Sequence, residues 1–567
     1  MKIRRNRSRE RGISLFLAVA GLVWIVIPML GLFIDVGILY SAKARLQAAV
    51  DGAALAAARA LNLGQSTAAQ ATAAQQNAVD WFYANFPPGN WNTFNTVMNT
   101  GTVTVVDSPN QANLRQVTVT ATTTVPAWFM KFFGFNSGTS LSLTGQASRR
   151  DVVAMLVLDR SGSMCSVGGG NPNPPCGAND GTPCASMITA AKNFTGSFAQ
   201  GRDKIGMLTF ADGYYTDSPP VTNFQTVLGY SNASGASNGD IDNITCAGGT
   251  GTPAAMSMAY NQLYMNAEPG AMNLIMLETD GLPNTVDYNY YPAPAANKAT
   301  LALANNSGCR DNNNKTVQQG GWTTPASLPN WLGSINMNNG SNPGYMANVP
   351  AGATGAFYTA DPAQKAQYGA YMILMFNPTD TSDSSGNNDS VYINGSANGC
   401  QFNNGSTNTY SDFQWLPSQD VFGNQVAPGN EYQALALTNV NGVMVNQLTG
   451  NASTDWPKTH AASLNATDNS AYNIRSNATL PAFVFVIGLG GNHGDPPDSV
   501  LLQRMANDPN GDQFNNPPNP NIQPCSQEPT CVNYPNQPQG EFIYSPSSAQ
   551  LGQAFLAISS QILRLSH

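Results

Sequence analysis

Charged residues are scarce in this chain of 567 residues. Asp, Glu, Lys and Arg make up only 10% of it, against roughly 25% in typical soluble domains. Its polar surface must therefore come from Asn, Ser, Thr, Gln and Gly, a composition that favours a secreted or surface protein. The formal net charge is -8, which argues against nucleic acid as a partner because phosphate binding needs a basic face. The 42% hydrophobic content is sufficient for a folded core.

Sequence signatures of catalysis are also missing. The chain has no P-loop, GxSxG elbow, HExxH motif or dinucleotide fingerprint. Only three histidines are present, and nothing in the sequence marks His460 or His493 as a base for Ser161 or Ser163. We therefore predict that the chain is not an enzyme.

Metal-binding cysteine pairs are absent as well. No CxxC occurs, and the histidines are not at ligand spacing, so a zinc site is disfavoured. All of the cysteines follow residue 150, and their even number favours disulfides in an oxidising compartment, the alternative being that some are free buried thiols. Spacing leaves the pairing open, with Cys525–Cys531 as the shortest bridge. The eight cysteines are Cys165, Cys176, Cys184, Cys246, Cys309, Cys400, Cys525 and Cys531.

The amino terminus combines a basic leader with an uncharged run. Residues 1–11 hold six Lys or Arg residues, and residues 13–34 then carry no charge. At about 1.5 Å per residue this run can cross a hydrocarbon core of roughly 30 Å, and the positive-inside rule places the leader in the cytoplasm. We predict an uncleaved helix across the bacterial inner membrane over residues 12–40, with a cleaved signal peptide as the alternative. At its outer end, Asp35 is expected to be solvated by headgroups and water.

The segment 41–150 changes from helical to strand periodicity. Apolar residues at helical spacing predict that the membrane helix continues to Gly64, and an Ala- and Gln-rich stretch predicts a second helix over 66–86. Alternating β-branched and small residues at 102–106 and 116–125 predict a small sheet packed on these helices.

This region resembles a known family. The order FIDVGILYSAKARLQAAVDGAALAAARAL, followed by VTVTATTTVPAWFMKFFGF, is similar to the N-terminal region of TadE-like and TadG-like proteins of the bacterial tight-adherence (Flp) pilus machinery, over roughly residues 1–150. Some of these relatives are processed like prepilins, and Gly12 follows a basic leader here. The prepilin pattern expects a glutamate as the fifth residue after the cut, where this chain has Leu17, so we expect no cleavage.

Oxygen-bearing side chains follow the buried strands of the second half. The apolar run 152–158 predicts a strand buried on both faces, and it ends in Asp159, Ser161 and Ser163. Thr250 lies in a glycine-rich loop before an amphipathic helix, and a second apolar strand ends in Asp280. Open α/β folds bind ligands above the carboxyl ends of their strands, and hard oxygen donors suit Mg²⁺.

The three motifs DxSxS, GGTxT and TDGxPN together resemble the metal-ion-dependent adhesion site of von Willebrand factor A-type (vWA) domains. The resemblance implies a divalent cation, Mg²⁺ first and Mn²⁺ or Ca²⁺ as alternatives, that receives an acidic side chain of a protein partner. By the same resemblance, the coordinating residues are Asp159, Ser161, Ser163, Thr250 and Asp280.

Strand and helix signals alternate along residues 151–567, which predicts a doubly wound, Rossmann-like α/β domain. Within this domain, the first helix is expected to end within 192–199, a later helix to cover 470–477, and a final helix to lie at the end of the chain. Strands are expected at 204–211 and 482–491. Insertions are predicted at 165–184 and 285–465. The second is too long for a bare loop, so it is either a small β-rich subdomain with a strand at 369–376 or partly disordered. A turn at 508–512 is a weaker candidate for Ca²⁺.

These patterns together predict a membrane-anchored, metal-dependent protein-binding component of Flp/Tad pilus assembly. Its bulk would lie in the periplasm or outside the cell, and its partner would be a pilus subunit or a secretion-channel component. The alternative is a surface adhesin whose Asn- and Tyr-rich insertion binds a host cell, matrix or another bacterium.

Overall fold

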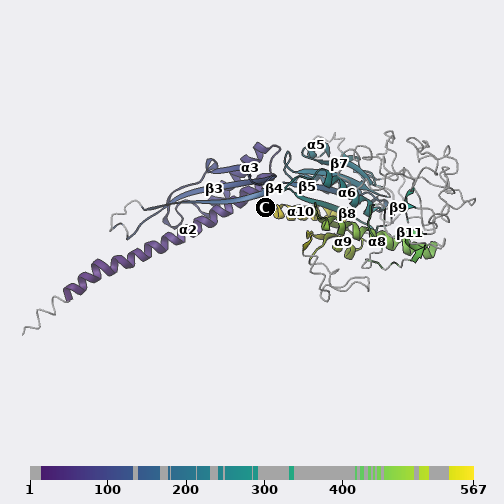
Figure 1. Cartoon of the computed structure of the whole chain (residues 1–567). Coiled ribbons are helices and arrows are strands. Elements are labelled where there is room, and N and C mark those ends of the chain that lie inside the picture. Colours follow the sequence, from purple (N-terminus) through teal and green to yellow (C-terminus); the bar gives the residue numbers. More distant parts are fainter. Residues whose placement is uncertain are drawn as a thin grey trace, which may run out of the picture. The chain divides into compact units, whose positions relative to one another are not determined.

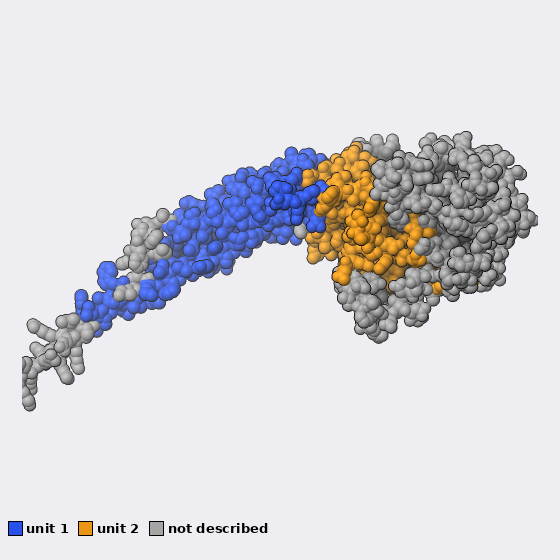
Figure 2. All heavy atoms as spheres, in the orientation of Figure 1, with its two compact units in different colours: residues 1–151, 566–567 blue, residues 152–565 orange. Residues whose placement is uncertain are grey.

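The chain forms two compact units in the computed structural model, one of residues 1–151 with 566–567 and the other of residues 152–565 (Figure 2). The structure describes residues 15–129, 131, 138–165, 176–178, 180–211, 214–229, 240–246, 250–283, 285–290, 331–336, 415–417, 420, 422–426, 432–433, 435, 438–440, 443–447, 452–490, 497–509 and 536–566.

One long helix is the axis of the first unit (Figure 1). A π-helical turn, η1 (Leu22–Val26), leads into α2 (Ile27–Arg59) and the 3₁₀ turn η2 (Ala60–Asn62). Pro28 lies two residues after this π-helical turn, inside the continuous helix Leu15–Asn62, and a local π-helical turn is one way in which a helix accommodates the missing N–H of a proline. Among the described residues, the helix from Leu15 to Asn62 alone is long and apolar enough to cross a membrane, judged by length and composition.

A second helix and a small antiparallel sheet complete this unit, as predicted. The Ser66 side chain caps α3 (Thr67–Asn85) by accepting the Ala69 N–H at 3.2 Å. The strands β1, β2 and β4 all pair with β3, whose alternate side chains are buried against an alanine-rich face of α2. The remaining elements are η3 (Asn90–Asn92), β1 (Phe94–Val97), η4 (Thr100–Thr102), β2 (Val103–Asp107), β3 (Leu114–Val125) and β4 (Thr139–Arg150).

The expectation for Asp35 was wrong. Its side chain is only 6% exposed, because the backbone that follows β3 covers it. The two carboxylate oxygens accept the N–H groups of Trp128 at 3.1 Å and Phe129 at 2.9 Å. Asp35 is thus bonded to the protein rather than solvated by headgroups and water.

A six-stranded sheet forms the centre of the second unit, in the order β15–β14–β8–β5–β6–β7. All neighbours are parallel except the edge strand β7, which pairs antiparallel with β6. The predicted doubly wound α/β fold is therefore confirmed. The strands are β5 (Val152–Asp159), β6 (Lys204–Phe210), β7 (Tyr214–Val221), β8 (Met272–Thr279), β14 (Phe483–Leu489) and β15 (Phe542–Ser545).

Helices cover both faces of this sheet. One apolar core joins the sheet to α6, α8 and α9, and the other joins it to α4 and α10, where Phe194 meets Phe555 edge to face. The helices are η6 (Gly162–Cys165), α4 (Pro183–Thr195), α5 (Phe224–Val227), η7 (Asp240–Asn243), α6 (Thr252–Met265), α8 (Ala452–Ser476), α9 (Ser499–Ala506) and α10 (Ser548–Leu565).

Three helices differ from their sequence-based expectations. The predicted amphipathic helix α6 is buried almost all round, because α8 packs on the side that it turns away from the sheet. Helix α4 ends at Thr195 rather than near 199, with Gly196 as its cap. Helix α8 begins at Ala452, so the stretch predicted as a helix over 470–477 is only its last part.

Some described parts of the predicted 285–465 insertion form antiparallel strands. The strands β9 (Thr285–Tyr290) and β10 (Trp331–Asn336) pair with each other, and β13 (Val443–Gln447) pairs with β11 (Trp415–Pro417) and β12 (Thr438–Val440). Phe422 and Tyr432 also join the core around α6. The strand expected at 369–376 lies outside the described residues.

Candidate functional site

The candidate site lies where the chain order of the sheet reverses. Strand β5 is central, with β6 on one side and β8 on the other. Asp159 is the last residue of β5 and Thr279 is the last residue of β8. Because the two strands are parallel, both polar side chains lie at the same carboxyl edge of the sheet. Such a switch point is the usual ligand position in open α/β sheets.

Asp159 is held by hydrogen bonds from both strand ends. Its Oδ1 accepts the backbone N–H of Ser161 at 2.8 Å, and its Oδ2 accepts the hydroxyl of Thr279 at 2.5 Å. The side chain is fully buried. Its position is therefore fixed by the turn that contains it and by the neighbouring strand.

Asp280 and the two predicted serines form the other half of the site. The Oδ1 of Asp280 accepts the Ser163 hydroxyl at 2.6 Å and lies 3.4 Å from the Ser161 hydroxyl. The two hydroxyl oxygens are 2.9 Å apart. Residues more than 115 positions apart in the sequence thus meet in one cluster of oxygen atoms.

Thr250 reaches the same cluster from the loop just before α6. A methyl group built on Gly281 would lie 3.6 Å from Thr250 Oγ1 and 3.8 Å from Ser163 Oγ. Both hydroxyls therefore flank the same glycine, and Thr250 itself is buried. The structure thus brings all five residues predicted from the sequence to one place.

Electrostatics in this cluster favours a cation. Burial raises the pKa of Asp159 despite its hydrogen bonds. Burial and then repulsion from Asp159 raise the pKa of Asp280 to about 8. The five side chains offer carboxylate and hydroxyl oxygens only, the ligand type that Mg²⁺, Mn²⁺ and Ca²⁺ prefer. A divalent cation would relieve the repulsion between the two aspartates, so the residues present fit such an ion.

Two residues beside the site were not predicted. Thr279 positions Asp159 through its hydroxyl. Its position directly before Asp280 in the TDG sequence is the sequence feature that could have indicated this role. Glu278 is fully buried on the opposite face of β8, and within the described structure neither of its carboxylate oxygens meets hydrogen-bond geometry. Burial, then repulsion from Asp159 and Asp280, raises its pKa well above the usual range, with a small opposing effect of the Asp159 N–H. The sequence feature that could have indicated Glu278 is an acidic residue within an otherwise apolar strand.

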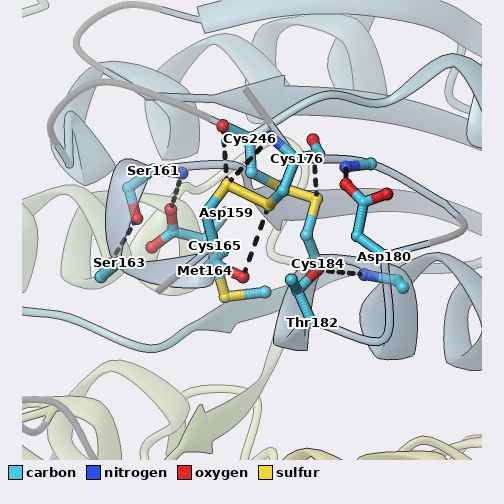
Figure 3. The surroundings of a disulfide bond; sticks show 12 residues. Asp159, Ser161, Ser163, Met164, Cys165, Cys176, Asp180, Thr182, Cys184 and Cys246 are labelled. Atoms are coloured by element: carbon cyan, nitrogen blue, oxygen red, sulfur yellow. Dashed lines mark hydrogen bonds between the residues drawn. A yellow bond between two sulfur atoms is a disulfide. The ribbon is translucent and has the colours of Figure 1, made fainter. Parts of the chain in front are cut away.

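Two disulfides lie directly beside the turn that holds Asp159, Ser161 and Ser163 (Figure 3). Cys165, two residues after Ser163, is bonded to Cys176, and Cys184 in the first turn of α4 is bonded to Cys246. The Cys246 N–H also donates to the Cys176 carbonyl at 2.9 Å. Cys246 precedes Thr250 by four residues, so the two bridges connect the DxSxS turn, α4 and the segment that leads to Thr250.

These disulfides also account for a cluster of sulfur atoms. The Sγ atoms of Cys176, Cys184 and Cys246 lie within 4.8 Å of one another. Each is already bonded to another sulfur, so none is available as a thiolate ligand for zinc. The other four cysteines lie outside the described residues, among them Cys525 and Cys531, which would form the shortest of the possible bridges.

The structure also places the weaker candidates from the sequence, the serine nucleophiles with a histidine base and the 508–512 turn. Ser161 and Ser163 face each other and Asp280, while His460 lies on α8 and His493 falls outside the described residues. In the predicted 508–512 turn, the Asp508 carboxylate accepts the Phe542 N–H at 3.2 Å, and Asp512 lies outside the described part of the chain.

Comparison with known proteins identifies both regions. Residues 12–60 match the family model described as Flp pilus-assembly TadE/G-like, and residues 154–282 match the model of the von Willebrand factor type A domain. No curated protein matches the chain.

Three solved structures of pilus proteins are similar to it. The SpaC pilus adhesin of Lactobacillus rhamnosus GG is 11% identical with a TM-score of 0.31, over 83% of this chain and 35% of that one. The PilB minor pilin of Streptococcus sanguinis is 10% identical with a TM-score of 0.28, over 83% and 79%. The vWF domain of the type V pili tip protein Mfa5 of Porphyromonas gingivalis is 14% identical with a TM-score of 0.30, over 74% and 98%.

The chain spans about a third of the SpaC length and 29% of a three-domain Mfa5 chain. At these identities and TM-scores the likenesses carry no functional argument. The two family matches, together with the doubly wound sheet, define the chain as a protein with a TadE/G-like pilus-assembly segment at its N-terminus and a von Willebrand factor A domain after it.

Proposed function

We propose that this chain is a membrane-anchored, extracytoplasmic component of Flp/Tad-type pilus assembly that binds a protein partner through a divalent cation. The observation that carries the proposal is the oxygen cluster of Asp159, Ser161, Ser163, Thr250 and Asp280 at the switch point of the sheet. Its donor chemistry suits Mg²⁺ first, and Mn²⁺ or Ca²⁺ next.

The proposed mode of action is binding rather than catalysis. Asp159 and Asp280 would hold the ion and the serine and threonine hydroxyls would orient it, while Thr279 keeps Asp159 in position. When bound, the ion supplies an electrophilic position for a carboxylate oxygen of the partner, which we propose is a pilus subunit or a secretion-channel component. Capture of a carboxylate needs no general base.

The proposed topology follows from the apolar helix and the basic leader. Residues 1–11 would lie in the cytoplasm, residues 12–40 would cross the inner membrane, and the TadE/G-like region 41–150 and the vWA domain 151–567 would lie outside. The length and composition of the helix support an anchor, and the disulfides support an oxidising compartment.

Calorimetry of the full-length chain in detergent tests the metal site. Mg²⁺ and Mn²⁺ should bind the wild type, while Asp159→Ala and Asp280→Ala should lose binding and remain folded. Glu268→Ala, an acidic residue ahead of the amino end of β8, is the matched control and should bind normally. A folded wild-type chain that binds neither ion would contradict the metal-dependent mechanism. Fractionation then separates the assembly role, which requires the inner membrane, from the adhesin alternative, which requires the cell surface.

A further inference from the structure

The segment after β3 is fastened to α2 at the outer end of the apolar helix. Asp35 lies one residue beyond the uncharged run 13–34, and its buried carboxylate accepts the N–H groups of Trp128 and Phe129. Two hydrogen bonds from backbone N–H groups to one carboxylate form a strong and directional contact. The segment after β3 is therefore held at one defined level of the helix.

A glycine one turn earlier makes room for the same segment. Gly31 and Asp35 are four residues apart, so they share one face of α2. A Cβ atom on Gly31 would lie 2.5 Å from Phe129 Cγ and 2.6 Å from its Cβ. Any larger side chain at this position would displace Phe129, so the close approach depends on the glycine.

Fastening this segment leaves aromatic surface exposed beside the apolar helix. Trp128 is 58% exposed and Phe129 42% exposed, and on α2 at the same level Phe33 is 66% exposed. Lys131, in the same segment, is also exposed. A tryptophan and a lysine at the end of a membrane helix match the side chains that prefer the headgroup region, where an aromatic ring meets both acyl chains and water.

We propose that the Trp128–Phe129 segment is a second membrane contact, which lies in the outer interface of the bilayer that α2 crosses. Trp128 would lie among the glycerol groups and upper acyl chains, and Lys131 would face anionic headgroups. Asp35 and Gly31 position this contact and do not themselves touch lipid. The inference rests on the proposed membrane anchor, and the occupant of this surface is lipid because the aromatic patch continues the apolar surface of the anchor.

Tryptophan quenching by brominated lipids tests the contact in the full-length chain. The protein would be placed in bilayers of phosphatidylethanolamine and phosphatidylglycerol with bromine either near the glycerol end or deep in the acyl chains. The signal of one tryptophan is the wild-type emission minus that of its Trp→Phe variant. Trp24, 71% exposed within the apolar helix, reports the anchor itself. Trp81, on α3, contacts α2 at Gly52 and serves as the aqueous control, about 25 Å further along the helix.

The proposal expects Trp24 to be quenched from within the bilayer, Trp128 to lose intensity with shallow bromines, and Trp81 to be unaffected. Asp35→Asn should weaken the quenching of Trp128 and leave that of Trp24 unchanged. Quenching of Trp24 without quenching of Trp128 would overturn the second contact while the anchor stands, and it would indicate a protein occupant for the aromatic patch. If neither tryptophan is quenched, the anchor and the second contact both fail.

Discussion

The Thr279 hydroxyl lies 2.5 Å from Asp159 Oδ2 and connects the ends of two neighbouring strands, β8 and β5. Both groups are buried, so this hydrogen bond between protein groups holds the carboxylate in place and water takes no part in it. It also leaves the other oxygen of Asp159 to the Ser161 N–H. The hydroxyl of Thr279 therefore belongs to the proposed metal site through its effect on Asp159.

Replacing Thr279 by valine should weaken both the fold and the site. The substitution keeps the shape and removes the donor, which leaves a buried carboxylate oxygen with one hydrogen bond fewer, at a cost of about 1–3 kcal/mol. Urea unfolding and Mg²⁺ titration of the same samples measure the two effects. Thr279→Ser keeps the hydroxyl and is the matched control. Equal Mg²⁺ affinity in the valine and serine variants would contradict a positioning role.

Mg²⁺ affinity should rise with pH. In the metal-free protein the pKa of Asp280 is raised to about 8, so below that pH the folded chain holds a proton that must leave when the cation binds. Each pH unit below about 8 should therefore weaken binding by up to about tenfold for this one proton.

The same raised pKa means that the stability of the metal-free protein falls as pH increases from the ordinary Asp range towards 8. Calorimetric titration with Mg²⁺ at several pH values, in buffers of different ionisation enthalpy, measures the proton released on binding. A Mg²⁺ affinity that does not change with pH would disprove the linkage.

Removing the two disulfides should have unequal effects on stability. Cys184–Cys246 closes 62 positions of sequence and Cys165–Cys176 closes 11, and chain entropy predicts losses of about 4 and about 3 kcal/mol respectively. Double alanine variants of each pair, compared by urea unfolding, test this order. Both variants should also bind Mg²⁺ more weakly, since each bridge holds a segment that carries or leads to proposed coordinating residues. Wild-type affinity in both variants would show that the turns hold their shape without the bridges.

Replacing Glu278 by glutamine should stabilise the metal-free protein. The wild-type carboxyl group is buried, and its pKa is raised by burial and by repulsion from two aspartates, so its cost to the fold grows as pH increases above the ordinary Glu range. Glutamine does not titrate, and we expect a gain of about 1–3 kcal/mol at pH 8 and a smaller one at pH 5. Thermal unfolding in the presence of a chelator measures both. Glu268→Gln, at a partly exposed site, should change little; a destabilised Glu278→Gln variant at pH 8 would refute the expectation.

Much of the fold was visible in short stretches of sequence. The apolar runs that became β5 and β8 are local signals, and so is the change from helical to alternating periodicity near residue 100. The grouping of Asp159 with Asp280 could be predicted because parallel strands end at one edge of a sheet. These features depend on spacing within one element or on a general rule of sheet geometry.

The features that could not be predicted depend on partners distant in sequence. Asp35 becomes buried only because a segment more than 90 positions later folds over it. Helix α6 is buried on its outer side because α8, nearly 200 residues further on, packs there. The pairing of Cys184 with Cys246 likewise requires the packed positions of α4 and the segment before α6. No local pattern contains that information.

On the proposed topology, the cysteine bridges beside the DxSxS turn would also determine when the candidate site is complete. Such bonds form in oxidising compartments and are kept reduced in the cytosol. A newly made chain that is still inside the cell would therefore carry the five candidate ligands before disulfides connect the DxSxS turn to the segment that leads to Thr250. If the chain is exported as we propose, oxidation outside the cytoplasm would complete these bridges, so a chain able to bind its proposed partner would form only after export.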